Sequence, residues 1–304
     1  MSQLFPPEII MTYRCKTITK AAIIICTVIA TFSFSSCYRT HNISSIDYGK
    51  SAFSFNKYGH ILLDGDYFFD TGAMVTLLIQ HDSLNMDNSK KTNFFQVVMD
   101  GSGKVKTEKL YFFENFSASD IQFNKAYFLM LSPETLSLTM QNAIQKGLIG
   151  MNFIKHANWL IDFKDSTIHC LSKDSIICIP ENNVLILKYK NRYHPKIDLV
   201  IDNHKFKNLL FDTGLGGDLL LRKSDLSQIK KNEALTKEIS YSSLYKSDST
   251  KQTTYMFEKL NVNDFIFTDI EVTEYIKPMV GVSFVKRFNY LFIDTKNQVF
   301  YLYN

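Results

Sequence analysis

The sequence Asp-Thr-Gly occurs twice in this chain, and each copy directly follows an apolar run. The first copy is Asp70-Thr71-Gly72 and the second is Asp212-Thr213-Gly214. One Asp-Thr-Gly is expected by chance in roughly one chain of this length in twenty, so a single copy would mean little. The flanks of the two copies also match, since residues 61–65 parallel 199–203 and residues 76–78 parallel 218–221. The sequence therefore predicts two copies of one unit, each presenting an aspartate at the end of a buried strand.

A second pair of matching segments supports this repeat. Leu148-Ile149-Gly150 and Met279-Val280-Gly281 each follow their own Asp-Thr-Gly by a similar distance. Each is followed by two apolar runs that form a closing hairpin pattern, at residues 159–170 and 290–302. We place the first unit at residues 51–180 and the second at residues 183–304.

Both units are predicted to consist mainly of strands. The chain contains 25 Phe and 16 Tyr, and its apolar residues alternate with polar ones, as strands require. A helix is expected over residues 132–146, where Ser132 can act as the N-cap. Helical spacing predicts another over residues 223–238, capped by Ser224. Residues 241–255 are expected to form a polar hairpin.

Composition excludes several classes of protein. A length of 304 residues is enough for two lobes, each with its own core. The net charge of +4 is small and no block of Lys or Arg is present, so nucleic acid is not an expected partner. The seven His residues are scattered, and neither His-Glu-x-x-His nor Cys-x-x-Cys occurs. No metal site is therefore predicted, and no Gly-x-Ser-x-Gly or phosphate-binding loop is present.

The N-terminus has the pattern of a targeting segment. An apolar run over residues 21–34 follows basic residues and ends in small residues before Cys37. This order resembles the lipobox of bacterial lipoproteins and implies a signal peptide over residues 1–36 with lipidation of Cys37. An ordinary signal peptide with an unmodified cysteine, or an uncleaved anchor, would also fit. Residues 37–50 are expected to be a flexible tether, and Met1 and Met11 are both candidates for the first residue.

Two cysteines lie in the folded part of the chain. Cys170 and Cys178 flank a polar turn, so a disulfide across a hairpin is one interpretation and two free thiols are the other. Spacing alone does not set the Cα distance that a disulfide requires.

The doubled Asp-Thr-Gly, each copy followed by two apolar residues and a glycine, resembles the retropepsin-like aspartic peptidases. The particular likeness is to single-chain, two-lobe proteins found as Bacteroidetes lipoproteins, and it covers nearly all of the chain after residue 50. The resemblance implies a mainly β protein with two acid-protease β-barrel lobes related by a pseudo-two-fold axis. It implies a monomer, no cofactor, a peptide or protein substrate, and a lipid-anchored location in the cell envelope facing the periplasm.

The resemblance also assigns roles to particular residues. Asp70 and Asp212 would form the catalytic pair, and Gly72 and Gly214 would allow tight turns beside them. Thr71 and Thr213 would brace the two loops through hydroxyl hydrogen bonds. The glycine-rich tip at Gly101-Ser102-Gly103 would be the flap that covers substrate.

The chemistry of a carboxyl pair explains the need for two copies. Hydrolysis of an amide needs one group to take a proton from water and another to donate a proton to the carbonyl oxygen. Two carboxylates held close together do not both ionise readily, so one pKa rises and the pair retains a shared proton. Each unit supplies one member of the pair.

The second copy departs from the usual pattern at Leu215, where a small or hydroxyl residue is common, and Gly216-Gly217 follows it. Met74 likewise replaces a more usual Ser or Thr, whereas Ala73 fits. Three functions are therefore weighed for this chain. The first is an aspartic endopeptidase with the Asp70/Asp212 pair. The second is a peptide-binding lipoprotein that keeps the fold without hydrolysis. The third is a structural envelope protein in which both motifs are only turns.

Overall fold

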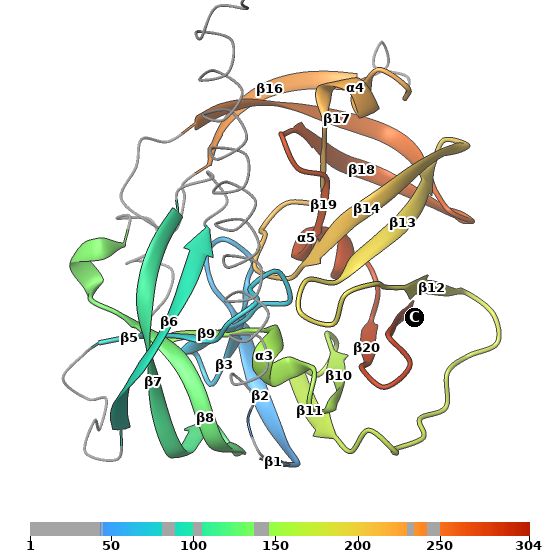
Figure 1. Ribbon diagram of the computed structural model, residues 1–304. Coiled ribbons are helices and arrows are strands. Elements are labelled where there is room, and N and C mark those ends of the chain that lie inside the picture. The colour runs from blue at the N-terminus through green and yellow to red at the C-terminus, as the bar shows by residue number, and fades with distance from the viewer. Residues whose placement is uncertain are drawn as a thin grey trace, which may run out of the picture. The chain divides into compact units, whose positions relative to one another are not determined.

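Alternating apolar and polar residues give this chain an almost entirely β architecture (Figure 1). The structure is a computed structural model that describes residues 43, 45–80, 89–99, 105–136, 146–229, 234–241 and 250–304. In β2 (Gly49–Phe55), Ser51 and Phe53 are buried while Ala52 and Ser54 are exposed. A strand with one face on a core needs this alternation.

The first lobe is built on strands in the order β3-β4-β9-β5-β8-β7-β6. The pairs β4/β9 and β5/β8 run parallel, and the other neighbours run antiparallel. β1 pairs with β8 outside this order. The elements are β1 (Ser45–Asp47), β3 (Ile61–Leu63), β4 (Tyr67–Phe69), β5 (Leu77–Ile79), β6 (Ser89–Met99), β7 (Val105–Ala118), β8 (Ile121–Leu131), η1 (Pro133–Thr135), β9 (Gly147–Ile149) and α3 (Met151–Ile154).

The second lobe repeats this order strand for strand, as β13-β14-β19-β15-β18-β17-β16. The parallel pairs recur at the matching places, β14/β19 and β15/β18. The elements are β13 (Lys196–Ile201), β14 (His204–Asp212), β15 (Leu219–Leu221), α4 (Lys223–Leu226), β16 (Ala234–Tyr241), β17 (Thr250–Val262), β18 (Phe265–Glu274), β19 (Met279–Gly281) and α5 (Val282–Val285). The internal repeat predicted from the two motifs is thus present in the strand order.

The closing hairpins of the two lobes pair with each other. The shared strands follow the order β12-β21-β20-β10-β11-β2, in which each strand has its counterpart at the mirrored position. β10 and β20 are antiparallel neighbours, with Trp159 opposite Ile293 and Ile161 opposite Leu291. The remaining bounds are β10 (Asn158–Asp162), β11 (Thr167–Leu171), β12 (Val184–Lys188), β20 (Tyr290–Asp294) and β21 (Val299–Tyr303). A main-chain ladder therefore joins the lobes.

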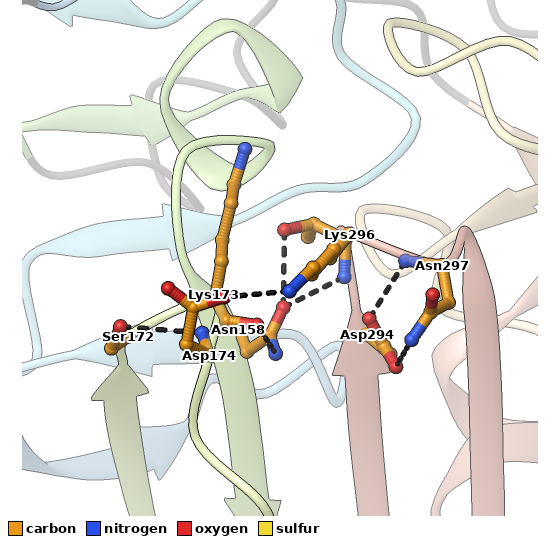
Figure 2. Close-up of polar contacts among 8 residues, drawn as sticks. Asn158, Ser172, Lys173, Asp174, Asp294, Lys296 and Asn297 are labelled. Atoms are coloured by element: carbon orange, nitrogen blue, oxygen red, sulfur yellow. Dashed lines mark hydrogen bonds and ion pairs between the residues drawn. The ribbon is translucent and has the colours of Figure 1, made fainter.

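Polar contacts close this junction beside the ladder, as Figure 2 shows. The Oδ1 atom of buried Asn158 accepts the backbone N–H of Thr295 at 2.9 Å, and its amide donates to the Lys173 carbonyl at 3.3 Å. Lys296 Nζ lies 2.6 Å from the Asp174 carboxylate. Because Lys296 and Asp174 are exposed, this ion pair contributes little to stability. The buried amide is the stronger link.

Aromatic residues directly before each Asp-Thr-Gly motif anchor the two motif loops in the core. Phe69 precedes Asp70 and packs edge-on against Trp159, with ring centroids 5.1 Å apart. Phe211 precedes Asp212 and stacks on Phe300 at 3.9 Å. All four side chains are fully buried, so the end of each strand is held by well-packed rings.

The helix expected over residues 223–238 is wrong beyond its first turn. Among the described residues of this segment, only Lys223–Leu226 is helical, and its N-cap is Arg222 instead of Ser224. Ala234–Tyr241 is a strand that pairs with β17. The hairpin predicted over residues 241–255 is therefore longer than expected, since it is formed by β16 and β17. Residues 242–249, between these strands, lie outside the described residues.

Two further expectations need correction. In the described part of the segment expected to be a helix, residues 133–135 form the 3-10 turn η1, Ser132 makes no side-chain cap hydrogen bond, and the backbone at Leu136 is extended. Residues 137–145 lie outside the described part of the chain. The tether expected over residues 37–50 is wrong at its end, because Ser45–Asp47 pairs with β8 and β2 starts at Gly49.

The two cysteines of the folded part are free thiols. Cys170 is buried, and this burial raises the pKa of its thiol to about 12, whereas Cys178 is exposed. The leader over residues 1–36 and Cys37 lie outside the described residues. Within the described ranges, no helix is long and apolar enough to cross a membrane.

Candidate active site

Each Asp-Thr-Gly begins where a strand ends beside a parallel neighbour. Phe69 pairs with Ile149 across β4 and β9, and the Asp70 N–H donates to the Ile149 carbonyl at 3.0 Å. In the second lobe, Asp212 pairs with Gly281 across β14 and β19. The apolar-apolar-Gly segments noted in the sequence are therefore the strands that set the position of both aspartates.

The two motifs contact each other across the lobes. A Cβ atom added at Gly72 would overlap the carboxyl group of Asp212. A Cβ atom at Gly214 would lie 2.5 Å from Cγ of Asp70, far inside van der Waals contact. Each glycine is thus required because the aspartate of the other lobe lies against it. The sequence pattern predicted a tight turn at these glycines, and the structure adds this close approach.

The two threonines form a reciprocal set of hydrogen bonds. Thr71 Oγ1 donates to the Phe211 carbonyl at 2.7 Å and accepts the Thr213 N–H at 3.1 Å. Thr213 Oγ1 donates to the Phe69 carbonyl at 2.6 Å and accepts the Thr71 N–H at 3.0 Å. Both threonines are fully buried, so these bonds are made without competition from water. The brace that the resemblance implied is present.

The carboxyl groups of Asp70 and Asp212 interact directly. Asp70 Oδ1 accepts the N–H groups of Gly72 at 2.8 Å and Ala73 at 2.9 Å, and Asp212 Oδ1 accepts that of Gly214 at 2.9 Å. A side-chain hydrogen bond joins the two acids. Loss of hydration raises the pKa of both carboxyls.

The two acids differ in the size of this shift. The pKa of Asp212 is raised well above its usual value by loss of hydration and then by the negative charge of Asp70. The hydrogen bond between them lowers the pKa of Asp70 and raises that of Asp212. The pair holds one proton between two groups.

The segment after each apolar-apolar-Gly supports the loop from behind. The Met151 N–H donates to the Ala73 carbonyl at 2.7 Å, and the Val282 N–H donates to the Leu215 carbonyl at 2.8 Å. A Cβ atom at Gly150 would lie 2.9 Å from the Ala73 oxygen, and one at Gly281 would lie 2.8 Å from the Leu215 oxygen. The close passage expected at these glycines is confirmed.

Buried polar contacts that support the two motif loops were not predicted from the sequence. In the first lobe, buried Thr76 donates its N–H to Asn152 Oδ1 at 2.7 Å. At the matching position of the second lobe, buried Asp218 forms a bidentate ion pair with Arg287 at 3.1 and 2.7 Å. A polar residue four positions after each motif glycine, at the start of an apolar run, was the available signal.

The departure at Leu215 has a structural explanation. Leu215 packs against a small apolar cluster of Leu210, Leu220 and Met279. Ala73, at the same place in the first lobe, packs against a larger cluster that includes Leu62, Phe68 and Leu148. The second cluster is smaller, and the residue that packs against it is larger than Ala73. Around Asp212 the Gly214 N–H still donates to Oδ1, but the Leu215 N–H donates to the Asp212 backbone carbonyl at 3.1 Å, whereas Ala73 in the first lobe donates to the Asp70 carboxylate.

The flap residues Gly101, Ser102 and Gly103 lie outside the described residues. The hairpin that carries them is described up to Met99 and from Val105, and its strand β6 contributes Val98 to the first-lobe apolar cluster. The flap assignment stays a prediction.

Removing the acid at Asp212 is expected to raise stability at neutral pH. A carboxyl whose pKa is higher in the folded state binds its proton more tightly there, and this binding adds to the free energy of unfolding. The added stability is fully present below the pKa of the unfolded state and is lost as the pH rises through the pKa of the folded state. Because the Asn side chain does not ionise, the Asp212→Asn variant does not lose stability in this way as the pH rises. Its thermal midpoint should exceed that of the parent at pH 7, with the gap closing toward pH 4. Asp165→Asn, at an exposed site, is the matched control, and equal gaps at all pH values would contradict the shifted pKa.

No protein-family model matches this sequence, and no curated protein matches it. Among solved structures, conglutin gamma, a basic 7S globulin from lupine seeds, is similar at 8% identity with a TM-score of 0.50, over 85% of this chain and 95% of that chain. Basic 7S globulin from soybean is similar at 8% identity with a TM-score of 0.49, over 85% and 94% of the chains. A retropepsin-like aspartic protease from Rickettsia conorii covers 39% of this chain and 89% of its own, at 20% identity and a TM-score of 0.31.

At these identities the likeness establishes fold and nothing finer. The lupine match extends over both β-sheet bodies, in agreement with the doubled strand order. This protein is therefore a mainly β protein whose two sheet bodies resemble the two-lobe pepsin-like fold.

Proposed function

We propose that this protein is an aspartic endopeptidase that hydrolyses peptide bonds with the Asp70/Asp212 pair. The observation that carries the proposal is the direct pairing of two acids from different lobes, in which each carboxyl lies against the motif glycine of the other lobe. Turns that merely reverse the chain need no such pairing, so the purely structural function explains less of the geometry.

In the proposed reaction, each acid has a separate task. Ionised Asp70 takes a proton from a water molecule, whose oxygen attacks the peptide carbonyl carbon. Protonated Asp212 donates its proton to the carbonyl oxygen, which gives a tetrahedral intermediate. When the C–N bond breaks, the leaving nitrogen receives the proton held by Asp70. One hydroxyl of the intermediate gives its proton to Asp212 as the new carboxyl group forms, so the pair returns to its singly protonated state.

The proposed substrate is an extended peptide with apolar side chains. Ala73 and Val75 are partly exposed beside the first motif, and Leu215 and Tyr275 are partly exposed beside the second cluster. These residues would contact apolar side chains on either side of the scissile bond.

We also propose that the chain is anchored to the cell envelope by lipidation of Cys37, facing the periplasm. The support is the leader pattern that ends at this cysteine. Mass spectrometry of the mature N-terminus tests it, because an unmodified Cys37 or an uncleaved leader would contradict the anchor.

A second candidate function is peptide binding without hydrolysis. The comparisons support it better than catalysis, because they show only the fold and two of the structures that match over most of the chain are named as globulins. A binding protein of this kind would use the same residues around the motifs and leave the peptide intact.

The purified protein should be incubated with a diverse peptide library between pH 3 and pH 8 and the products read by mass spectrometry. We expect cleavage by the parent, and none by Asp70→Asn or Asp212→Asn, provided that both variants remain folded by circular dichroism. Asp165→Asn should cleave like the parent. Retention of intact peptides by the parent on a column, without any product, would overturn hydrolysis in favour of binding.

A further inference from the structure

A lysine stands directly after each of the two helices that follow the apolar-apolar-Gly segments. Lys155 is the C-cap of α3 and Lys286 is the C-cap of α5. Each side chain reaches an aromatic ring of the other lobe. Lys155 Nζ lies 3.6 Å from the ring centroid of Tyr193, and Lys286 Nζ lies 4.0 Å from that of Phe55. Both lie within the roughly 6 Å over which a cation is attracted to a ring face, so the repeat makes two cation–π contacts between the lobes.

The two contacts differ in burial. Lys155 is 8% exposed, whereas Lys286 and Phe55 are both exposed. An exposed ammonium group keeps most of its hydration, so its attraction to a ring is weak. Where water is excluded, the same attraction is several times larger because it is screened less. The contact between Lys155 and Tyr193 is therefore the stronger of the two, and the contact at Lys286 is its matched weak counterpart.

Lys155 is tied through its backbone to the first motif loop. Its N–H donates to the Met151 carbonyl at 3.1 Å, and the Met151 N–H donates to the Ala73 carbonyl at 2.7 Å. The N–H of Ala73 donates in turn to the Asp70 carboxylate at 2.9 Å. All four residues of α3 are buried. One packed helical turn therefore separates the lysine from the loop that carries Asp70.

Tyr193 is tied in a similar way to the strand that carries Asp212. It lies in the turn between β12 and β13, where Asn191 Oδ1 accepts its N–H at 3.1 Å. The turn ends at Pro195, whose carbonyl accepts the N–H of Phe211 at 2.9 Å. Phe211 directly precedes Asp212 and is fully buried. The ring of Tyr193 therefore belongs to a segment that is hydrogen-bonded beside the second acid.

We propose that Lys155 is a positioning residue for the acid pair, which acts through Tyr193 by holding the first lobe against the segment that leads to Asp212. The reciprocal threonine bonds join the two motifs themselves. The lysine adds a second attachment on the strand side of Asp212, which limits rotation of one lobe about the threonines. The kinetic consequence rests on the proposed hydrolysis. The geometric consequence, that the two carboxyls separate when this contact is lost, stands whether or not the protein cleaves peptides.

The charge of Lys155 can be removed by pH as well as by substitution. Burial, and next the charges of Lys173 and Arg192, lower the pKa of the Lys155 amine to about 7. The pKa of the adjacent His156 is lowered to about 4, so this ring is neutral when the lysine titrates. The attraction to the ring should thus be present at pH 5 and lost at pH 9. Because the folded state binds the lysine proton less tightly than the unfolded chain, the stability that this group contributes rises from about pH 7 to 10.5 while the contact weakens.

A double-variant cycle measures the contact itself. Lys155→Met keeps the length of the side chain and removes its charge, and Tyr193→Leu removes the ring. At pH 5 the two changes should be coupled by a factor of about 30 in the unfolding equilibrium constant, the size of a desolvated cation–π contact, and at pH 9 the factor should fall toward 1. The cycle of Lys286→Met and Phe55→Leu should give a factor of about 5 or less. A factor near 1 at pH 5, or the same factor at both pH values, would overturn the contact.

The positioning role is read first from the acids. Carbon-13 titration of the Asp70 and Asp212 carboxyls, assigned with the two Asn variants, should show two pKa values that lie closer together in Lys155→Met, because separated carboxyls interact less. Lys155→Arg keeps the charge and should return the titration to that of the parent. An unchanged titration in folded Lys155→Met, or the same change in both variants, would overturn the positioning role.

The second readout is turnover at pH 5 on a peptide found in the library. Lys155→Met should lower kcat about 10-fold with little change in KM, since the loss is one of alignment, and Lys155→Arg should recover most of kcat. Lys57→Met, at an exposed lysine that lies 5.1 Å from the ring of Tyr58 in its own lobe, should match the parent. Equal losses for Met and Arg at position 155 would overturn the proposal.

Two further outcomes are distinguishable. If Lys155→Met does not fold, Tyr193→Leu and Tyr193→Phe give the same comparison, because phenylalanine keeps the ring and should keep the carboxyl titration of the parent. Equal effects of Leu and Phe on that titration would overturn the proposal. If the titration changes as expected and no form of the protein cuts any peptide, the proposed hydrolysis fails and the positioning of the acids by Lys155 stands.

Discussion

Gly72→Ala is expected to lower kcat by at least about 100-fold, because a displacement of the reacting groups by about 1 Å has an effect of this size. The added methyl group would overlap the Asp212 carboxyl, so that carboxyl must move away from Asp70. The hydrogen bond between the acids would lengthen, and the pair would no longer share one proton. Initial rates on a peptide identified by the library would measure the loss.

The matched control for this variant is Gly65→Ala. Gly65 has φ of +74°, and a Cβ atom there would meet nothing within 4 Å. The alanine therefore adds backbone strain of about 1 kcal/mol without a collision, and kcat should not change. Activity of Gly72→Ala at the level of this control would show that Asp212 need not stay in place.

Thr213→Val is expected to destabilise the protein by about 2–6 kcal/mol, since it leaves two buried groups without partners at about 1–3 kcal/mol each. Valine has the shape of threonine but cannot donate to the Phe69 carbonyl or accept the Thr71 N–H. The expected loss is a large part of the 5–15 kcal/mol that typically separates folded from unfolded domains. Urea unfolding followed by tryptophan fluorescence would measure it, with Trp159 as the only indole.

Thr213→Ser provides the control because it keeps the hydroxyl and loses one methyl group, at about 0.8 kcal/mol. Thr71→Val should show a loss similar to that of Thr213→Val, since its hydroxyl bonds the Phe211 carbonyl and the Thr213 N–H. The double variant should lose less than the sum, because the four bonds form one network. If serine is as damaging as valine, packing and not hydrogen bonding holds the motifs together.

The fold could be predicted well wherever the sequence repeats itself. Two copies of an apolar run, a motif and an apolar-apolar-Gly segment specified two lobes, and the strand order bears this out. The segment at residues 223–238 failed because its few apolar residues fit a helical spacing over a short window, which does not separate helix from strand. Its outcome was decided by eight paired positions between β16 and β17, which no local pattern reveals.

The same division applies to the site. Asp70, Asp212 and the two threonines could be predicted because the motif itself carries them. The support that Arg287 gives to Asp218 could not, because the two residues lie 69 positions apart in the sequence. Contacts of this kind arise only when the lobe folds and brings its distant segments together.

The central claim, that Asp70 and Asp212 jointly direct water to a peptide bond, is tested most directly by a single turnover in water enriched in oxygen-18 with the protein in excess over peptide. The account predicts oxygen-18 in the new carboxyl terminus of the product, none in the carboxyls of Asp70 and Asp212, and no product from Asp70→Asn or Asp212→Asn. Oxygen-18 in either aspartate would indicate a covalent intermediate, and undiminished product from the two variants would show that another site performs the cleavage. Either result would contradict the account.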